Sequence, residues 1–181
     1  MNTLNQNLLS EHLAKGNEFC AAGEYQEAIE SFNEALEIDP NNVNALEQIR
    51  FALEKLGAYQ LAADMHGAII EALGYEWEMA IKLGKFFEMP RIFSGKKRTL
   101  NNTGILLFKS GKYQEAIVVF NMALEGDPEH VDALIGKGIT LIRLEKYQEA
   151  IEIFNKVPEE DLKYADALSG RRIALNRLRK A

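Results

Sequence analysis

Cysteine, proline and long apolar runs are scarce in this sequence, and each scarcity excludes a class of structure. The single cysteine, Cys20, rules out an internal disulfide framework and a cysteine-cluster metal site. Only four prolines interrupt 181 residues rich in Ala, Leu, Glu and Lys, which favours helices over strands. No apolar run approaches the roughly 18 residues of a membrane span, and residues 1–9 lack the basic start and apolar stretch of a signal peptide. We therefore expect a cytoplasmic protein that does not enter a membrane.

Positive charge is also in short supply. The formal net charge is −6, whereas proteins that follow a nucleic-acid backbone carry an excess of Lys and Arg. Hydrophobic residues make up 47% of the chain, which is enough for a substantial buried surface. Paired carboxylates, an activated nucleophile or a metal-ligand cluster do not stand out in the sequence, so we expect neither an enzyme nor a bound cofactor or metal.

What the chain does contain is an internal repeat. The start-to-start offsets of one recurring phrase are 34, 54 and 34 residues. Longer context agrees in three copies, where Phe32, Phe120 and Phe154 each follow the last alanine of the phrase by four residues. The four copies are Gly23-Glu-Tyr-Gln-Glu-Ala28, Gly57-Ala-Tyr-Gln-Leu-Ala62, Gly111-Lys-Tyr-Gln-Glu-Ala116 and Glu145-Lys-Tyr-Gln-Glu-Ala150. Such a period indicates one structural unit repeated along the chain.

Each unit is expected to be a hairpin of two short helices. About 14 residues of helical periodicity, helix A, precede the phrase; a turn at the phrase leads into helix B, whose alanines and phenylalanine share one stripe. Small residues such as Gly16, Gly104 and Gly138 would let the two backbones approach closely. Helices of this length are marginal alone in water, so each hairpin must be stabilised by stacking on the next.

These features resemble the tetratricopeptide repeat (TPR) family. Residues 9–42 and 97–130 match its pattern nearly throughout, and residues 131–164 match as far as Val157. Residues 43–76 are degenerate, with Arg50 in place of the usual glycine and His66 in place of the aromatic residue. The resemblance implies an all-α solenoid of antiparallel helix pairs that presents a concave groove to a peptide or protein segment, as a scaffold or adaptor.

The array is expected to be irregular in the middle, because the 54-residue offset exceeds the repeat by 20 residues. Leu83-Gly84-x-x-Phe87 resembles a helix A, but Pro90 and Gly95 follow instead of a helix B and suggest a loop. We therefore divide the chain into an N-terminal half, a connector and a C-terminal half. The N-terminal half is 1–88 (repeats 9–42 and 43–76, solitary helix 77–88), the connector is 89–96, and the C-terminal half is 97–181 (repeats 97–130 and 131–164, capping helix 165–180). The two solitary helices read as caps; alternatively, 89–98 is a joint between two lobes.

The resemblance also implies which residues line the groove, since the family uses fixed positions of helix A. The N-terminal half would contribute Asn17, Gln48, Phe51, Lys82 and Lys85, and the C-terminal half Asn102, Ile105, Lys109, Ile139 and Arg143, with Ile135, Ile173 and Arg177 in equivalent positions. The mixture of apolar, amide and cationic side chains suits a peptide with hydrophobic anchors and some acidic character.

Three alternatives stay open at this point. Apolar groove residues could bury against a second copy, making the protein a self-assembling homo-oligomer. A basic segment ending at Arg98 and the C-terminal helix could attract nucleic acid. One TPR branch grips a C-terminal carboxylate with Lys, Asn, Asn, Lys and Arg; here Asn17 agrees and Gln48 and Lys82 are chemically related, but Leu13 and Glu78 stand where lysines are required.

Overall fold

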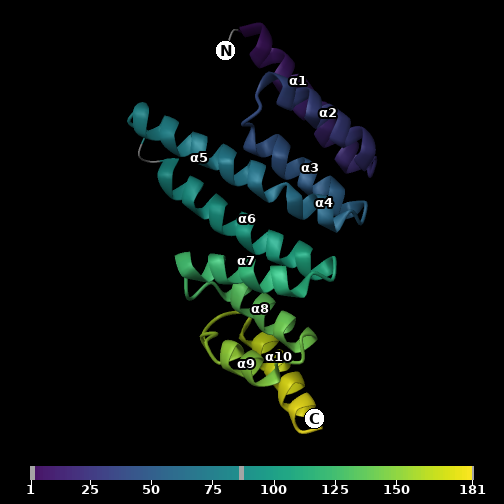
Figure 1. The fold of residues 1–181 in the computed structure, drawn as a ribbon. Helices are drawn as coiled ribbons and strands as arrows, with labels where there is room; N and C mark the ends of the chain where they lie inside the picture. Colours follow the sequence, from purple (N-terminus) through teal and green to yellow (C-terminus); the bar gives the residue numbers. More distant parts are fainter. Residues whose placement is uncertain (1–2, 86–87, 181) are drawn as a thin grey trace. The chain divides into compact units, whose positions relative to one another are not determined.

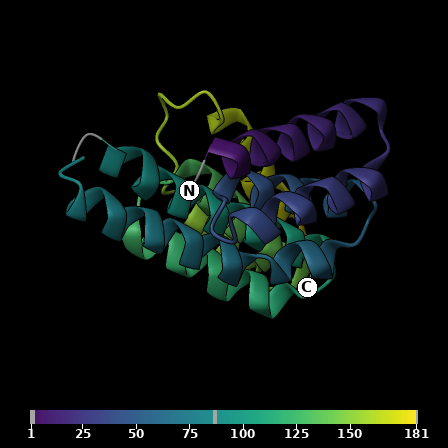
Figure 2. The same cartoon turned by 90° about the horizontal axis from the view of Figure 1, so that it is seen from above.

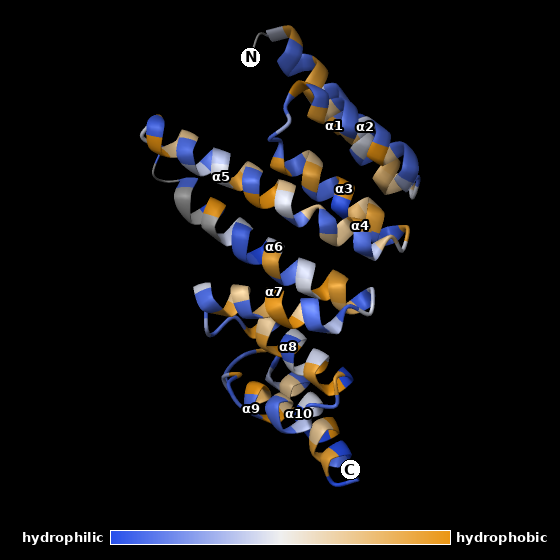
Figure 3. Cartoon of the chain, viewed as in Figure 1, coloured by the Kyte–Doolittle hydropathy of each residue, from blue (hydrophilic) through white to orange (hydrophobic). Residues whose placement is uncertain are grey.

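The computed structural model describes residues 3–85 and 88–180, and over these residues the chain consists of α-helices and turns without a strand (Figure 1). The expected all-α solenoid of helix pairs is confirmed. The chain divides into two compact units, residues 1–99 and 100–181. Apolar and polar residues alternate along each helix, so a helix buries one side only (Figure 3).

The first unit contains two helical hairpins and the beginning of a long helix. α1 and α2 lie side by side and antiparallel in both views (Figure 1, Figure 2), and α2 in turn contacts α3. The helices of this unit are α1 (Thr3–Ala22), α2 (Tyr25–Ile38), α3 (Val43–Lys55), α4 (Tyr59–Asp64), α5 (His66–Lys82) and the first half of α6 (Met89–Lys109).

The second unit begins within α6 and contains two hairpins and a final helix. Its helices beyond α6 are α7 (Tyr113–Gly126), α8 (Val131–Arg143), α9 (Tyr147–Phe154) and α10 (Tyr164–Leu178). α8 contacts α7, α9 and α10, so each hairpin rests on the next, as the repeat predicts.

The first residue of the repeated phrase makes the turn between the helices of a hairpin. Gly23, Gly57 and Gly111 have φ values of 82°, 75° and 81°, a left-handed conformation that glycine adopts without steric cost. The next residue closes the turn: in the third repeat, for example, the N–H of Lys112 donates to the carbonyl of Leu107 at 2.9 Å. Glu145 holds the same conformation in the fourth repeat with φ 61°, which costs a residue with a Cβ about 1 kcal/mol.

The conserved spacing of glycine and phenylalanine produces the closest contacts in the fold. Phe154 is 2% exposed, and its ring lies against Gly138 of its own hairpin and Gly170 of α10. A Cβ on either glycine would fall within 2.6 Å or 2.4 Å of the ring, respectively. Phe120 is held in the same way, between Gly104 and Gly136. Each phenylalanine therefore joins two successive hairpin layers, which is the physical basis of the serial stacking.

The expected solitary helix 77–88 is wrong, because α5 runs without interruption from His66 to Lys82. Residue 74 is a glycine where the first and third repeats have Pro40 and Pro128, so nothing stops the helix there. Gly84, taken from the sequence for a helix A glycine, instead ends α5: its φ is 67°, and the N–H of Lys85 donates to the carbonyl of Ala80 at 2.8 Å. Phe87, the last residue of that proposed signature, lies outside the described residues.

The expected irregular connector 89–96 is also wrong, because these residues form the first turns of α6. Pro90 is the second residue of this helix, where a missing N–H has no intrahelical partner to lose. The sequence suggested that proline ends a helix here; in the structure it stands at the beginning of one. The boundary between the two units falls within α6, at residues 99 and 100, rather than in a connector.

The twenty extra residues therefore lengthen two helices of the array. The first half of α6 packs on α5 in the first unit: Ile92 is fully buried in a cluster with Leu73 of α5, and a Cβ on Gly95 would lie 3.1 Å from the same leucine. The ammonium of Lys96 lies 5.9 Å from the centroid of the Trp77 ring. What the sequence presented as a basic loop is a packed helix.

The degenerate second repeat has exchanged its glycine and phenylalanine for Arg50 and His66. The Arg50 guanidinium is nearly buried and donates to the Glu47 carboxylate from Nε at 3.0 Å and from Nη2 at 2.8 Å. Thr99 of α6 donates to the other oxygen of Glu47 at 3.3 Å. Without the aromatic ring, the second helix of this hairpin is broken at Met65 into α4 and α5.

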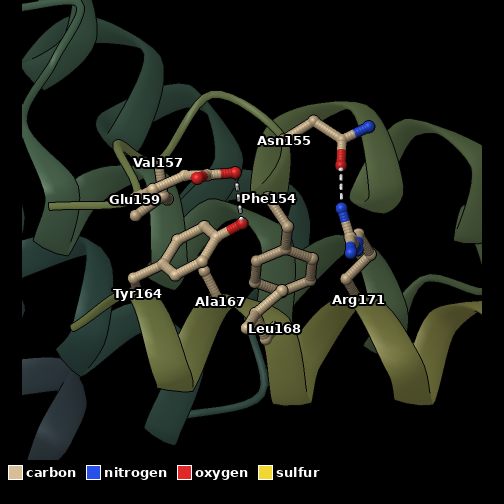
Figure 4. Close-up of a pocket in the computed structure, with 8 residues that line it drawn as sticks. All are labelled: Phe154, Asn155, Val157, Glu159, Tyr164, Ala167, Leu168 and Arg171. Atoms are coloured by element: carbon tan, nitrogen blue, oxygen red, sulfur yellow. Dashed lines mark hydrogen bonds between the residues drawn. The ribbon is translucent and has the colours of Figure 1, made fainter. Parts of the chain in front are cut away.

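The final helix is fixed at its beginning as well as at Gly170. Figure 4 shows the hydroxyl of Tyr164 donating to Glu159 at 3.1 Å and the Arg171 guanidinium donating to the side-chain oxygen of Asn155 at 2.9 Å. Both contacts tie the segment after α9 to the first two turns of α10, so this small polar hollow has a structural role.

Candidate functional site

Isoleucine and a cationic residue recur together on the helix A face of the second unit. Ile105, Ile139 and Ile173 are 34 residues apart, on α6, α8 and α10. Four residues after each isoleucine stands a cation: Lys109, Arg143 or Arg177. Residues four apart lie on the same face of a helix, so each of the three helices offers one isoleucine and one cation to the same surface.

Two open hollows lie along this surface, which we call the isoleucine groove. The first hollow, of about 310 Å³, lies between α6 and α8, and the second, of about 510 Å³, lies between α8 and α10. Ile135 and Ile139 line both, so the hollows are contiguous. The first is otherwise lined by Ile105, Phe108, Lys109, Phe120, Asp132 and Gly136, and the second by Ile142, Arg143, Asp166, Ser169, Gly170, Ile173 and Arg177.

The apolar side chains of the groove are open to solvent. Ile139 is 40% exposed and Ile173 is 49% exposed, while Ile105 and Ile135 are half-buried. The glycines beneath them explain why the surface is hollow: Gly136 and Gly170 have no side chain, and the rings of Phe120 and Phe154 lie against them. The contacts that stack the hairpins thus also shape the groove.

Charge is separated along the groove helices. Arg143 and Arg177 stand in the last turns of α8 and α10, and Asp132 and Asp166 in their first turns. Each charge is favoured by the dipole of its own helix, so one edge of the groove is cationic and the other acidic. The acidic edge is partly neutralised, because the Lys163 ammonium donates to Asp132, a hydrogen bond that raises the pKa of Lys163.

The cationic edge is supported by aromatic residues. The Arg143 guanidinium lies 5.8 Å from the centroid of the Phe108 ring, and that ring lies 5.4 Å from the ring of Tyr113. This arrangement limits the side-chain freedom of Arg143 while leaving its charge available. Over residues 88–180, no carboxylate lies within 4 Å of the guanidinium of Arg143 or of Arg177.

The structure places four of the five residues expected from the C-terminal half in these hollows: Ile105, Lys109, Ile139 and Arg143. Asn102 is half-buried on α6 and is not among the lining residues of either hollow. Sequence reasoning missed Phe108 and the two aspartates, as well as the role of Gly136 and Gly170. The 34-residue separation of these two glycines was a signal that could have revealed them.

The residues expected from the N-terminal half are more dispersed. Phe51 is 37% exposed; its ring meets Tyr25 edge-on at 6.3 Å, and the Lys55 ammonium lies 5.2 Å from its centroid. Asn17 is exposed on α1, Gln48 is half-buried on α3, and Lys82 is the last residue of α5.

Lys85 does not occupy the helix A position that the family pattern assigns to it. It lies beyond the end of α5, and its ammonium is 3.4 Å from the Glu88 carboxylate. The assignment is wrong because Gly84 ends the helix one residue earlier.

Two family descriptions match the chain where its repeats are most regular. "Tetratricopeptide repeat" matches residues 107–171 and "TPR repeat" matches residues 16–57. The chain belongs to the TPR family. The first match covers the helices of the isoleucine groove from Leu107 to Arg171, so the groove is made by regular TPR units.

A characterised relative and two solved structures show the same repeat. The chain is 26% identical over 117 residues to "Small glutamine-rich tetratricopeptide repeat-containing protein 2" of Mycosarcoma maydis, a match covering 65% of the chain and 28% of the relative. A TPR protein from Parabacteroides merdae superposes with a TM-score of 0.74 at 22% identity, over 96% of this chain and 61% of that one. MamA superposes with a TM-score of 0.66 at 17% identity, over 97% and 90%. These structural likenesses show the fold.

The TPR fold supports a role in protein interaction in general. The chain spans less than a third of the length of the fungal relative. Over residues 3–85 and 88–180, no helix has the length and apolar character needed to cross a membrane. In the same part of the chain, His, Cys, Asp and Glu side chains do not gather in threes where a metal ion could be held.

Proposed function

We propose that the second unit is a protein-interaction module, and that it binds a segment of a partner protein in the isoleucine groove. The observation that supports this most strongly is the coincidence of exposed isoleucines with cations at every repeat of the groove. Exposed apolar side chains are common singly, but contiguous ones beside fixed charges are typical of binding surfaces. As a scaffold or adaptor, the protein would bring that partner to whatever its first unit contacts.

The proposed ligand is a short apolar segment with negative charge. Burial of apolar surface contributes about 25 cal/mol per Å², so each isoleucine covered by the partner stabilises the complex. Carboxylates on the ligand would meet Arg143 and Arg177, and charge-assisted hydrogen bonds to arginine are among the stronger polar contacts. The groove thus offers both anchoring and selection by charge.

The experiment is a selection of peptides from an unbiased displayed library on the wild-type protein, followed by binding measurements on variants. Ile139→Glu places a charge in the floor shared by both hollows and should abolish binding of the selected peptides. Val118→Glu is the matched control, because Val118 is 58% exposed on α7, outside the lining of either hollow. Equal binding by both variants would show that the ligand site lies elsewhere.

Self-assembly is the second candidate, since a second copy could cover Ile139 and Ile173, which are 40% and 49% exposed. Light scattering over a concentration series separates the two functions. A monomer at all concentrations leaves the groove for a different partner, whereas a dimer that Ile139→Glu dissociates would make the groove a self-association surface.

A carboxylate clamp in the first unit is a weaker candidate. Leu13, where the clamp requires a lysine, packs against the core cluster of α1 and α2. Glu78, at the other lysine position, is exposed on α5 and would repel a carboxylate. We therefore place the proposed ligand site in the second unit.

A further inference from the structure

The spacing of the groove ladder specifies the ligand more closely than its charge does. We propose that the isoleucine groove recognises a peptide in the polyproline II conformation, with an apolar and an acidic residue each recurring at every third position. This inference rests on the proposed function and names the class of segment that the groove would take.

The first step is the distance between the rungs of the ladder. A ligand that covers Ile105, Ile139 and Ile173 in turn must cross from α6 to α8 to α10. Packed helices lie about 8–10 Å apart, and α8 and α10 are in direct contact. The ligand must therefore advance by about 8–10 Å between one apolar side chain and the next.

The second step is to ask which peptide conformation returns a side chain to the same face over that distance. Polyproline II rises about 3.1 Å per residue and has three residues per turn, so every third side chain points the same way after about 9.3 Å. A β-strand reaches about 10 Å in three residues, but side chains three apart point to opposite faces. An α-helix would need seven residues for about 10.5 Å, and its width of about 10–12 Å would hold it above the hollows.

The third step is the position of the charges. Each cation stands four residues after its isoleucine, and therefore one helical turn towards the cationic edge. In polyproline II, the residue next to the apolar one points to the side by about 120°. An acidic side chain there would meet Lys109, Arg143 or Arg177 at each rung, while the third residue of each triplet faces solvent.

The two hollows fit this register. Each lies between two neighbouring helices and has room for about one large apolar side chain with part of the peptide backbone. They share Ile135 and Ile139, so a peptide that fills one continues into the other. A proline at the third position would hold the peptide in the required conformation before binding and so reduce the entropy lost.

The test uses three labelled peptides of identical composition and the full-length protein, with binding measured by fluorescence anisotropy. The first peptide repeats Leu-Glu-Pro; the second contains the same residues in an order that removes the period of three; the third spaces leucines and glutamates by seven. We expect the first to bind about tenfold more tightly than either of the others, a preference worth about 1.4 kcal/mol.

Charge-reversed variants connect the preference to the ladder. Arg143→Glu and Arg177→Glu together should weaken binding of the Leu-Glu-Pro peptide by about tenfold or more. Arg172→Glu is the matched control, because Arg172 is exposed on the same helix as Arg177 but does not line either hollow. It should leave affinity nearly unchanged.

The outcomes separate this inference from the proposed function. If library-selected peptides bind the groove but the rearranged or seven-spaced peptide binds as well as Leu-Glu-Pro, the register is wrong and groove binding stands. The register is equally wrong if selected peptides bind while no designed peptide does. If neither selected nor designed peptides bind, both proposals fail.

Discussion

The clasp of Phe154 between two glycines allows a substitution whose sign is opposite to ordinary expectation. Replacing glycine by alanine inside a helix usually stabilises it by about 1 kcal/mol. At Gly170, however, the new Cβ would lie 2.4, 2.7 and 2.9 Å from three ring atoms of Phe154, where carbon atoms normally stay about 3.5–4.0 Å apart. The ring would have to move by about 1 Å.

The ring has nowhere to move. Gly138 lies on its other side, where a Cβ would be only 2.6 Å away, and the side chain is 2% exposed. Overpacking costs about 1–3 kcal/mol; we expect the upper end, and after the gain in helix propensity Gly170→Ala should lower the free energy of unfolding by about 2 kcal/mol. The melting temperature should fall by about 4–8 °C.

The assay is urea unfolding followed by circular dichroism, with Gly74→Ala as the matched control. Gly74 also lies inside a helix, α5, but a Cβ there would meet nothing within 4 Å. That variant should be more stable than wild type by about 0.5–1 kcal/mol. If Gly170→Ala were as stable as Gly74→Ala, the glycine clasp would not be what joins the last hairpin to α10.

Three further variants test other parts of the structure. Ile92→Ala should cost about 2–5 kcal/mol in urea unfolding, because Ile92 is fully buried at the start of α6; a loss below about 0.5 kcal/mol would indicate an exposed connector instead. Glu145→Gly should raise stability by about 1 kcal/mol by relieving the left-handed turn, and a destabilised variant would contradict this reading of the turn. Burial lowers the pKa of His66, so its protonated form is disfavoured in the folded state, and its contribution to stability is present above about pH 6.5 and lost as the pH falls through the lowered folded pKa. His66→Phe should therefore lose less stability than wild type between pH 7.5 and 5.5, and identical pH profiles would exclude this role.

The repeat arrangement was readable from the sequence because each signature residue has one physical task. Gly23 and Gly111 start the phrase since the turn requires a left-handed residue, and Phe120 and Phe154 recur since a large ring must fill the gap that small residues leave. The same regularity made the groove of the second unit predictable. Positions 34 residues apart face the same way as long as every hairpin has the same length.

The segment 77–96 was not predictable for the same reason. Gly84 and Gly104 occur in similar short patterns, yet one ends a helix and the other receives a phenylalanine ring. Pro90 reads as a helix breaker unless the start of the helix is known. Only the packing of Ile92 on α5 decides the matter, and that contact joins residues whose pairing is not written in the local sequence.

The most direct test of groove binding is a methyl NMR titration of the isoleucine-labelled protein with a peptide selected from the displayed library. We expect the methyl signals of Ile105, Ile139 and Ile173 to shift together, with one apparent dissociation constant. The methyl signal of Ile81, which is 49% exposed on α5 in the first unit, should remain in place. Unchanged signals from the three groove isoleucines, with saturable shifts elsewhere, would contradict the proposal.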